Sequence, residues 1–189
     1  MKKLNCLNFL KNYVKKFSTI NKKESDESII KHQWDFSKHS LLPFLYMFKF
    51  NKDNIGYVLH DVKTKSLIGI DFGEYEISSR IIQNLEKNLN SKLKYIFTTH
   101  AHNDHQGGNE KWKMMRGNEL KIFCGSNEDR AKGDFISTFD KKLNDLETMT
   151  IGDLCIACMY TPGHMKSHVC YIITHVIDNT DISYKRDKQ

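Results

Sequence analysis

An apolar segment followed at once by a loop dense in histidine is the strongest constraint on this sequence. Residues 93–98 are apolar and rich in aromatic and β-branched side chains, as expected of a buried strand. The six positions from His100 to His105 then hold three imidazoles and one carboxylate, and Gly107-Gly108 follows. Such groups gathered where a strand ends indicate a metal site, because the backbone freedom of a loop lets them converge.

The spacing within this loop favours two neighbouring ions. His100 and His102 alternate along the chain, so in an extended conformation both imidazoles project from the same side and can bind one ion. Asp104 and His105 are adjacent, and a tight turn would direct both of them to a second ion. A hard oxygen beside a borderline nitrogen suits zinc, iron or manganese.

A second part of the site is expected downstream, at Thr161-Pro162-Gly163-His164. Proline followed by glycine favours a turn after the apolar strand 154–160, which leaves His164 on a loop at the end of that strand. His168 lies on the same loop. We interpret it as a supporting or packing residue rather than as a ligand.

These motifs, His-x-His-x-Asp-His followed by Thr-Pro-Gly-His, resemble the signature of the metallo-β-lactamase superfamily. The stretches Gly107-Gly108-Asn109-Glu110-Lys111 and 120–125 resemble the glyoxalase II family at the same places. The resemblance covers residues 42–174. It implies an α/β (α+β) fold, the αββα sandwich, in which two mixed sheets pack face to face, helices lie outside, and metal ions lie at one edge between the sheets.

The resemblance also implies a reaction, the hydrolysis of a glutathione thioester, S-D-lactoylglutathione, to D-lactate and glutathione. In the family two ions of zinc, iron or manganese activate water and polarise the carbonyl group. Carried over to this chain, the ligands are His100, His102 and His164 for one ion, and Asp104 and His105 for the other. Asp104 would also orient the attacking water as a catalytic residue.

Beyond His164 the chain departs from the family pattern. The family has a bridging aspartate after a glycine and then a last histidine ligand, whereas only Asp178, Asp181 and Asp187 follow here, none of them after glycine. We therefore expect the C-terminal part of the domain to be missing, one ion in place of two, and weak activity. The alternatives are a non-catalytic metal-binding remnant, a mono-iron persulfide dioxygenase and a tRNA-processing nuclease.

Charge separates the first part of the chain from the rest. Residues 1–40 hold nine Lys and four acidic residues, whereas the remaining chain holds 20 basic and 19 acidic residues. We predict a basic N-terminal extension or presequence at 1–41 and a metallo-β-lactamase-like domain at 42–189. A presequence would direct the protein to a mitochondrion or plastid, and without one we expect it in the cytoplasm. The nearly neutral domain argues against a nucleic-acid partner, and the interrupted apolar pattern argues against a membrane span.

The rest of the domain shows alternating strand and helix patterns. We predict strands at 43–50, 55–61 and 66–71, a helix built on Ile77, Ile81, Ile82, Leu85 and Leu89, and a βαβ step into residues 93–98. Asp71 ends the third strand. The resembling family has an aspartate at this place, which supports the loop from His100 to His105, the histidine loop. A turn aspartate before glycine explains its position equally well.

A second helix is predicted at 109–115, with Trp112 as a core anchor and Gly117 as its cap. Further strands are expected at 121–124 and 169–176, a short helix or loop at 127–132, and a hairpin from 148 to 160 that turns at Gly152-Asp153. Cys155 and Cys158 resemble a redox or zinc pair, but an offset of three within a strand places them on opposite faces. We predict that they are buried, unpaired thiols.

Overall fold

The computed structural model describes residues 36–38, 44–126 and 139–175. All of them belong to one unit of the chain. Three sequence predictions concern residues that lie wholly or mostly outside these ranges, namely the presequence, of which only residues 36–38 are described, the helix or loop at 127–132, and the acidic residues Asp178, Asp181 and Asp187.

Seven strands form the larger sheet, in the order β1-β2-β3-β4-β5-β6-β7. Strands β1 to β4 are antiparallel neighbours, and strands β4 to β7 are parallel neighbours. The strands are β1 (Phe36–Lys38), β2 (Leu45–Phe50), β3 (Asn54–Asp61), β4 (Ser66–Ile70), β5 (Lys92–Phe97), β6 (Lys121–Gly125) and β7 (Lys141–Leu143). The antiparallel meander predicted from the first three apolar runs is confirmed as β2, β3 and β4.

Three antiparallel strands form the smaller sheet, in the order β10-β9-β8. They are β8 (Thr148–Ile151), β9 (Leu154–Tyr160) and β10 (Val169–His175). Gly152 in the β8–β9 turn has a φ of 56°, a conformation that glycine adopts without steric cost. Cys155 and Cys158 lie on opposite faces of β9 as predicted. Both are unpaired, and Cys158 is buried whereas Cys155 is half-buried.

Three α-helices are described, α2 (Tyr75–Leu89), α3 (Asn103–Gln106) and α4 (Asn109–Arg116), and the 3-10 helix η2 (Gly117–Glu119) follows α4. Helix α2 buries Ile82 and Leu85, two of the apolar positions that predicted it. Trp112 of α4 is 1% exposed and its indole Nε1 donates to Ser78 Oγ of α2 at 3.0 Å, which confirms its place in the core. Gly117, with a φ of 56°, ends α4 as expected.

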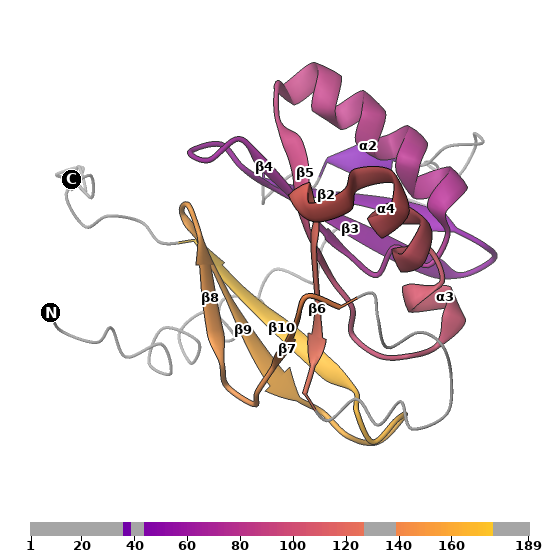
Figure 1. Ribbon diagram of the computed structural model, residues 1–189, viewed down its shortest axis with the longest axis vertical. Helices are drawn as coiled ribbons and strands as arrows, with labels where there is room; N and C mark the ends of the chain where they lie inside the picture. The colour runs from indigo at the N-terminus through magenta and orange to yellow at the C-terminus, as the bar shows by residue number, and fades with distance from the viewer. Residues whose placement is uncertain (1–35, 39–43, 127–138, 176–189) are drawn as a thin grey trace, which may run out of the picture. The chain divides into compact units, whose positions relative to one another are not determined.

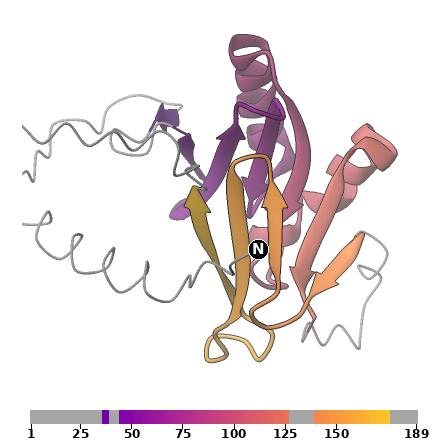
Figure 2. The ribbon, with the colours of Figure 1, turned by 90° about the vertical axis from the view of Figure 1, so that its left-hand side faces the viewer.

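The two sheets pack face to face, and α2 and α4 cover the other face of the larger sheet (Figures 1 and 2). Neighbouring residues of β3 show the alternation, because Val58 packs in the core under the helices and Leu59 packs in the core between the sheets. The described residues thus form three layers, helices, larger sheet and smaller sheet. Among them no helix covers the outer face of the smaller sheet.

The topology places several chain segments at one edge of the larger sheet. Strands β4 and β5 are parallel and joined by α2, so their carboxyl ends meet, and Asp71 and the histidine loop follow these two ends. Strand β3 is antiparallel to β4, so its first residue, Asn54, also lies at this edge. The α3 helix lies beyond the end of β5 (Figure 1). Residues far apart in sequence therefore meet where the metal ligands were predicted.

The smaller sheet is joined to this edge by hydrogen bonds from β10. The backbone amide of Val169 donates to the carbonyl oxygen of Thr99 at 3.0 Å, and the Tyr171 hydroxyl donates to the carbonyl oxygen of Thr98 at 2.8 Å. Both acceptors lie between β5 and the histidines. The β9–β10 loop, which carries His164, is therefore held beside the histidine loop.

Four described elements have no counterpart in the sequence predictions, namely β1, β7, α3 and the 3-10 helix η2. Strand β7 has only three residues and two exposed lysines, so it lacks the apolar alternation on which strand prediction depends. Its position comes from tertiary contacts, because Asp140 at its start accepts hydrogen bonds from Lys113 at 2.7 Å and Lys121 at 3.1 Å. Strand β1 lies within the segment 1–41 and pairs with β2.

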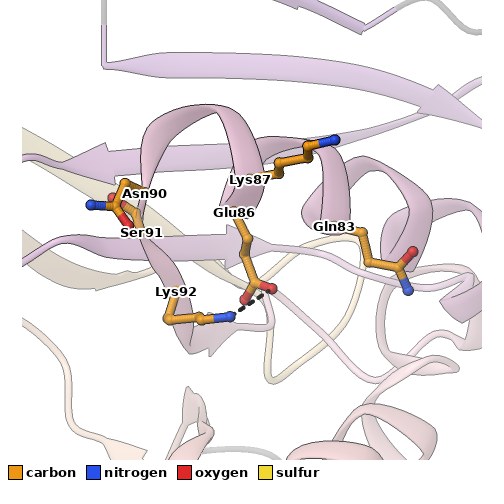
Figure 3. Close-up of a pocket in the computed structure, with 6 residues that line it drawn as sticks. All are labelled: Gln83, Glu86, Lys87, Asn90, Ser91 and Lys92. Carbon is orange, nitrogen blue, oxygen red and sulfur yellow. Dashed lines mark ion pairs between the residues drawn. The ribbon is translucent and has the colours of Figure 1, made fainter.

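A polar cleft of about 350 Å³ lies at the C-terminal end of α2, at the start of β5 and away from the histidine loop that follows the other end of that strand (Figure 3). Glu86 in this cleft is paired with Arg116 at 3.0 Å and with Lys92 at 3.8 Å, and it accepts a hydrogen bond from the Leu93 amide at 2.9 Å. These contacts connect α2 to β5 and α4. No helix in the described ranges is both long enough and apolar enough to cross a membrane.

Candidate metal centre

Three imidazoles converge at this edge of the larger sheet. Among the described residues, His100, His102 and His164 each offer one nitrogen, and these nitrogens all lie within 4.8 Å of one another. His102 Nδ1 lies 3.1 Å from His100 Nε2 and 3.0 Å from His164 Nε2. His164 is 62 positions from His102 in the sequence, so the packing of the two sheets brings them together.

The arrangement of the three nitrogens fits a cation better than a set of hydrogen bonds. An imidazole nitrogen carries either one hydrogen or one lone pair, so His102 Nδ1 cannot form two well-directed hydrogen bonds. A cation accepts the lone pairs of all three rings. Nitrogen ligands about 2.1 Å from a tetrahedral zinc ion lie about 3.4 Å apart. The spacing of 3.0 and 3.1 Å in this site is close to that value.

His100 is the buried member of the three, with 3% of its surface exposed. Burial, together with the nearby charge of His105, lowers its pKa to about 4, so the ring is neutral near pH 7 and retains a lone pair for a metal. Its Nδ1 lies 2.9 Å from Thr99 Oγ1, which leaves Nε2 directed to His102. The other two imidazoles are exposed, so the site is open to solvent on their side.

The Asp71 side chain contacts the histidine loop through its carboxylate. Its carboxylate accepts hydrogen bonds from the Thr99 amide at 2.8 Å and the Thr99 hydroxyl at 2.8 Å, and it lies 3.0 Å from His105 Nδ1. It is 6% exposed and has a φ of 56°, a left-handed conformation that non-glycine residues seldom adopt. Asp71 is therefore more than a turn residue, because its carboxylate contacts the loop on both sides of His100.

Asp104 and His105 lie next to the three histidines. His105 Nε2 is 3.6 Å from Asp104 Oδ2, and the His105 ring centroid is 4.0 Å from that of His100. The hydrogen bond to Asp71 raises the pKa of His105, and a hydrogen bond from the Asn54 amide lowers the pKa of Asp104. Helix α3, which begins at Asn103, contains both residues and supplies the tight turn that was expected there.

His168 lies at the margin of the cluster. Its ring centroid is 4.9 Å from that of His100 and 6.1 Å from that of His164, while its Nδ1 lies 2.9 Å from Thr161 Oγ1. Burial, followed by the charge of His164, lowers its pKa. His168 therefore contacts the site from the base of the β9–β10 loop, as a packing neighbour would.

Two residues of the site were not singled out from the sequence. Thr99 lies between Asp71 and His100 and hydrogen-bonds to both. Asn54 donates from its side-chain amide to Asp104. A threonine beside a histidine and an asparagine in a polar turn have no distinctive local pattern, so only the spatial arrangement reveals them.

The contact between Gly73 and Asp104 leads to a testable expectation. A Cβ atom at Gly73 would lie 1.9 Å from the Asp104 carbonyl oxygen, so a Gly73→Ala substitution must displace the loop that carries Asp104 and His105. We expect a loss of about 1–3 kcal/mol in the free energy of unfolding, as for other overpacking changes, measured by urea denaturation. Gly163→Ala is the matched control, because no atom lies within 4 Å of a Cβ atom built there. Equal stability of the two variants would contradict the expectation.

No family model matches the chain. Among curated proteins it is similar to a hydroxyacylglutathione hydrolase of Dictyostelium discoideum, with 35% identity over 65% of this chain and 42% of that protein. It is similar to a cytoplasmic hydroxyacylglutathione hydrolase of Arabidopsis thaliana, with 34% identity over 65% of this chain and 43% of that protein. The chain spans less than half the length of these relatives.

Several solved structures resemble this chain in fold. A metallo-β-lactamase of Cronobacter sakazakii matches with a TM-score of 0.58 and 21% identity, covering 73% of this chain and 57% of that one. A class B3 di-zinc metallo-β-lactamase from an Alaskan soil metagenome matches with a TM-score of 0.55 and 22% identity, covering 72% of this chain and 56% of that one. The described part of the chain therefore has the metallo-β-lactamase fold, as the sequence motifs predicted.

Proposed function

We propose that this chain, which has the metallo-β-lactamase fold and resembles hydroxyacylglutathione hydrolases in sequence, is a metal-dependent hydrolase that acts on glutathione thioesters. The observation that carries the proposal is the convergence of three imidazole nitrogens from two distant loops, all within 4.8 Å of one another. The names of the curated relatives supply the proposed substrate class. The reaction would convert a thioester such as S-D-lactoylglutathione to a carboxylic acid and glutathione.

His100, His102 and His164 would hold the metal ion, and zinc is the ion that this donor set favours. Three protein ligands leave a position open for water or substrate, which is the arrangement of catalytic zinc sites. When bound, the metal supplies a lowered pKa for water and polarises the thioester carbonyl. His102 and His164 are exposed, so a substrate can approach the ion from their side.

The remaining residues orient the site. Asp71 keeps Thr99 and His105 in place, and Thr99 in turn fixes the His100 ring through Nδ1. Asp104, next to the histidines, would accept a hydrogen bond from the attacking water and so orient it toward the carbonyl carbon. The water oxygen would bond to the carbonyl carbon and the carbon–sulfur bond would break. The glutathione sulfur would take up the proton that the water loses and leave as a thiol.

A thioester assay on the 189-residue protein with added zinc, iron or manganese tests this function. We expect turnover of S-D-lactoylglutathione that needs the added metal ion, because the ion supplies the activated water and polarises the carbonyl group. Asp104→Ala should abolish the turnover without removing the ion from the histidines.

Three outcomes are informative. Metal-dependent turnover that Asp104→Ala abolishes would support the proposed function and the role of Asp104 in it. Metal binding without any turnover above the buffer rate would favour the alternative of a non-catalytic metal-binding protein. Absence of metal binding would contradict both the proposed hydrolase and the non-catalytic metal-binding protein.

A further inference from the structure

Asn54 contacts the site from a part of the chain that no motif marks. It is the first residue of β3, and its side-chain Nδ2 donates to Asp104 Oδ2 at 2.8 Å and to the Asp104 carbonyl oxygen at 3.2 Å. The two residues are 50 positions apart in the sequence. One amide group therefore holds both the carboxylate and the main chain of Asp104.

Asp104 is held from a second direction as well. The main chain of Gly73 packs so closely against it that a Cβ atom on Gly73 would lie 1.9 Å from the Asp104 carbonyl oxygen and 2.9 Å from the His105 amide nitrogen. The β2–β3 turn and the segment after β4 thus restrain Asp104 together. With its main chain restrained, the direction of its carboxylate depends on the hydrogen bond from Asn54.

This direction places Asp104 Oδ2 next to His105. The distance from Asp104 Oδ2 to His105 Nε2 is 3.6 Å, and His105 is fixed by the contact of its Nδ1 with Asp71 at 3.0 Å. Two ligands about 2.1 Å from one ion are at most about 4.2 Å apart, so this pair can share an ion. A carboxylate oxygen has two lone pairs, so Oδ2 can accept from Asn54 and still bind a cation.

We propose that Asn54 is a positioning residue that sets Asp104 for a second divalent ion, held by Asp104 and His105 beside the ion of the three histidines. The inference rests on the proposed metal-dependent function. The family resemblance implies Asp104 and His105 as ligands of a second ion, and the new element is the role of Asn54 in setting Asp104 for it. An amide suits this role because it is a neutral donor. A lysine or arginine there would fix the carboxylate equally well, but its charge would repel the ion.

The test is a titration of the metal-free protein with cobalt(II), followed by calorimetry and by the visible absorption of the bound ion. We expect two equivalents to bind to the unaltered chain, with different affinities. Asn54→Ala and Asn54→Leu both remove the donor, and Leu keeps the volume of the side chain. In both variants the second equivalent should bind about 10- to 100-fold more weakly, the range typical of losing a partner that orients a ligand, while affinity for the first equivalent and its spectrum stay unchanged.

Asp53→Ala is the matched control, since Asp53 is an exposed neighbour in the same turn. It should leave both equivalents unchanged. If both Asn54 variants bind the second equivalent of cobalt(II) with the affinity of the unaltered chain, the inference is wrong. A fall in melting temperature with equal loss of both equivalents would overturn it, because that pattern belongs to a structural residue. A single equivalent in the unaltered chain would also overturn it.

The titration measures binding rather than turnover, so it separates this inference from the proposed function. Two equivalents with the expected Asn54 effect but no thioester hydrolysis would support the inference and contradict the proposed reaction. Metal-dependent hydrolysis by a chain that binds only one equivalent would support the proposed reaction and contradict the inference.

Discussion

The His102→Ala variant should lose most of the divalent metal that the three histidines hold in the unaltered chain. His102 Nδ1 is the central atom of the cluster, 3.1 Å from His100 Nε2 and 3.0 Å from His164 Nε2. Removing it leaves two ligands for the ion, so we expect affinity to fall by more than the 10- to 100-fold that is typical of losing an outer partner. Elemental analysis after dialysis, and calorimetric titration with zinc, would measure the loss.

This substitution is a clean probe because His102 is exposed, so the fold should tolerate it. His175→Ala is the matched control. His175 is an exposed histidine at the end of β10, and its ring packs on Phe44, 5.8 Å away between centroids, rather than on the site. Metal content that is equal in the two variants would show that the three histidines do not hold the ion.

The second large effect is expected at Asp71, where one carboxylate organises the loop. Asp71→Ala leaves the Thr99 amide, the Thr99 hydroxyl and His105 Nδ1 without their acceptor. An unsatisfied buried polar group costs about 1–3 kcal/mol. Thr99 and His105 are half-buried, so water replaces part of what they lose, and we expect a net loss of about 1–3 kcal/mol in the free energy of unfolding. Metal affinity should fall about 10- to 100-fold, because the loop that presents the histidines is no longer oriented.

Two further variants separate the causes of this effect. Asp71→Gly relieves the left-handed backbone, with its φ of 56°, but also removes the carboxylate. Asp71→Asn retains the shape and tolerates that backbone, but replaces one acceptor oxygen by a donor nitrogen. Both should weaken metal binding if the hydrogen bonds are responsible. Asp153→Ala, at an exposed carboxylate paired with Lys63 at 2.8 Å, is the control and should change stability by less than about 1 kcal/mol.

The local chemistry of the histidine loop could be predicted from the sequence alone. Residues 93–98 predicted a buried strand, and β5 spans Lys92–Phe97. The spacing of His100 and His102 predicted that their imidazoles project from the same side of the chain, and their nitrogens lie 3.1 Å apart. Such predictions succeed because ligand spacing and apolar periodicity act between residues that are close in the chain.

The fold class was also accessible from sequence, although by resemblance rather than by periodicity. The strand and helix patterns gave the meander, the parallel step from β4 to β5 and the β8–β9 hairpin. The same patterns did not predict β7, whose sequence is Lys-Lys-Leu, or α3, which has four residues. Short elements without an apolar pattern depend on tertiary contacts for their stability.

The tertiary structure alone decided which distant residues complete the site. His164 reaches His102 across 62 positions, and Asn54 reaches Asp104 across 50. Asp71, whose role from the residues alone was open, proved to bind Thr99 and to contact His105. These contacts follow from the strand order of the larger sheet and from the apolar packing that presses β9 and β10 against it. Strand order and sheet packing are set by the summed burial of many side chains, which no local pattern encodes.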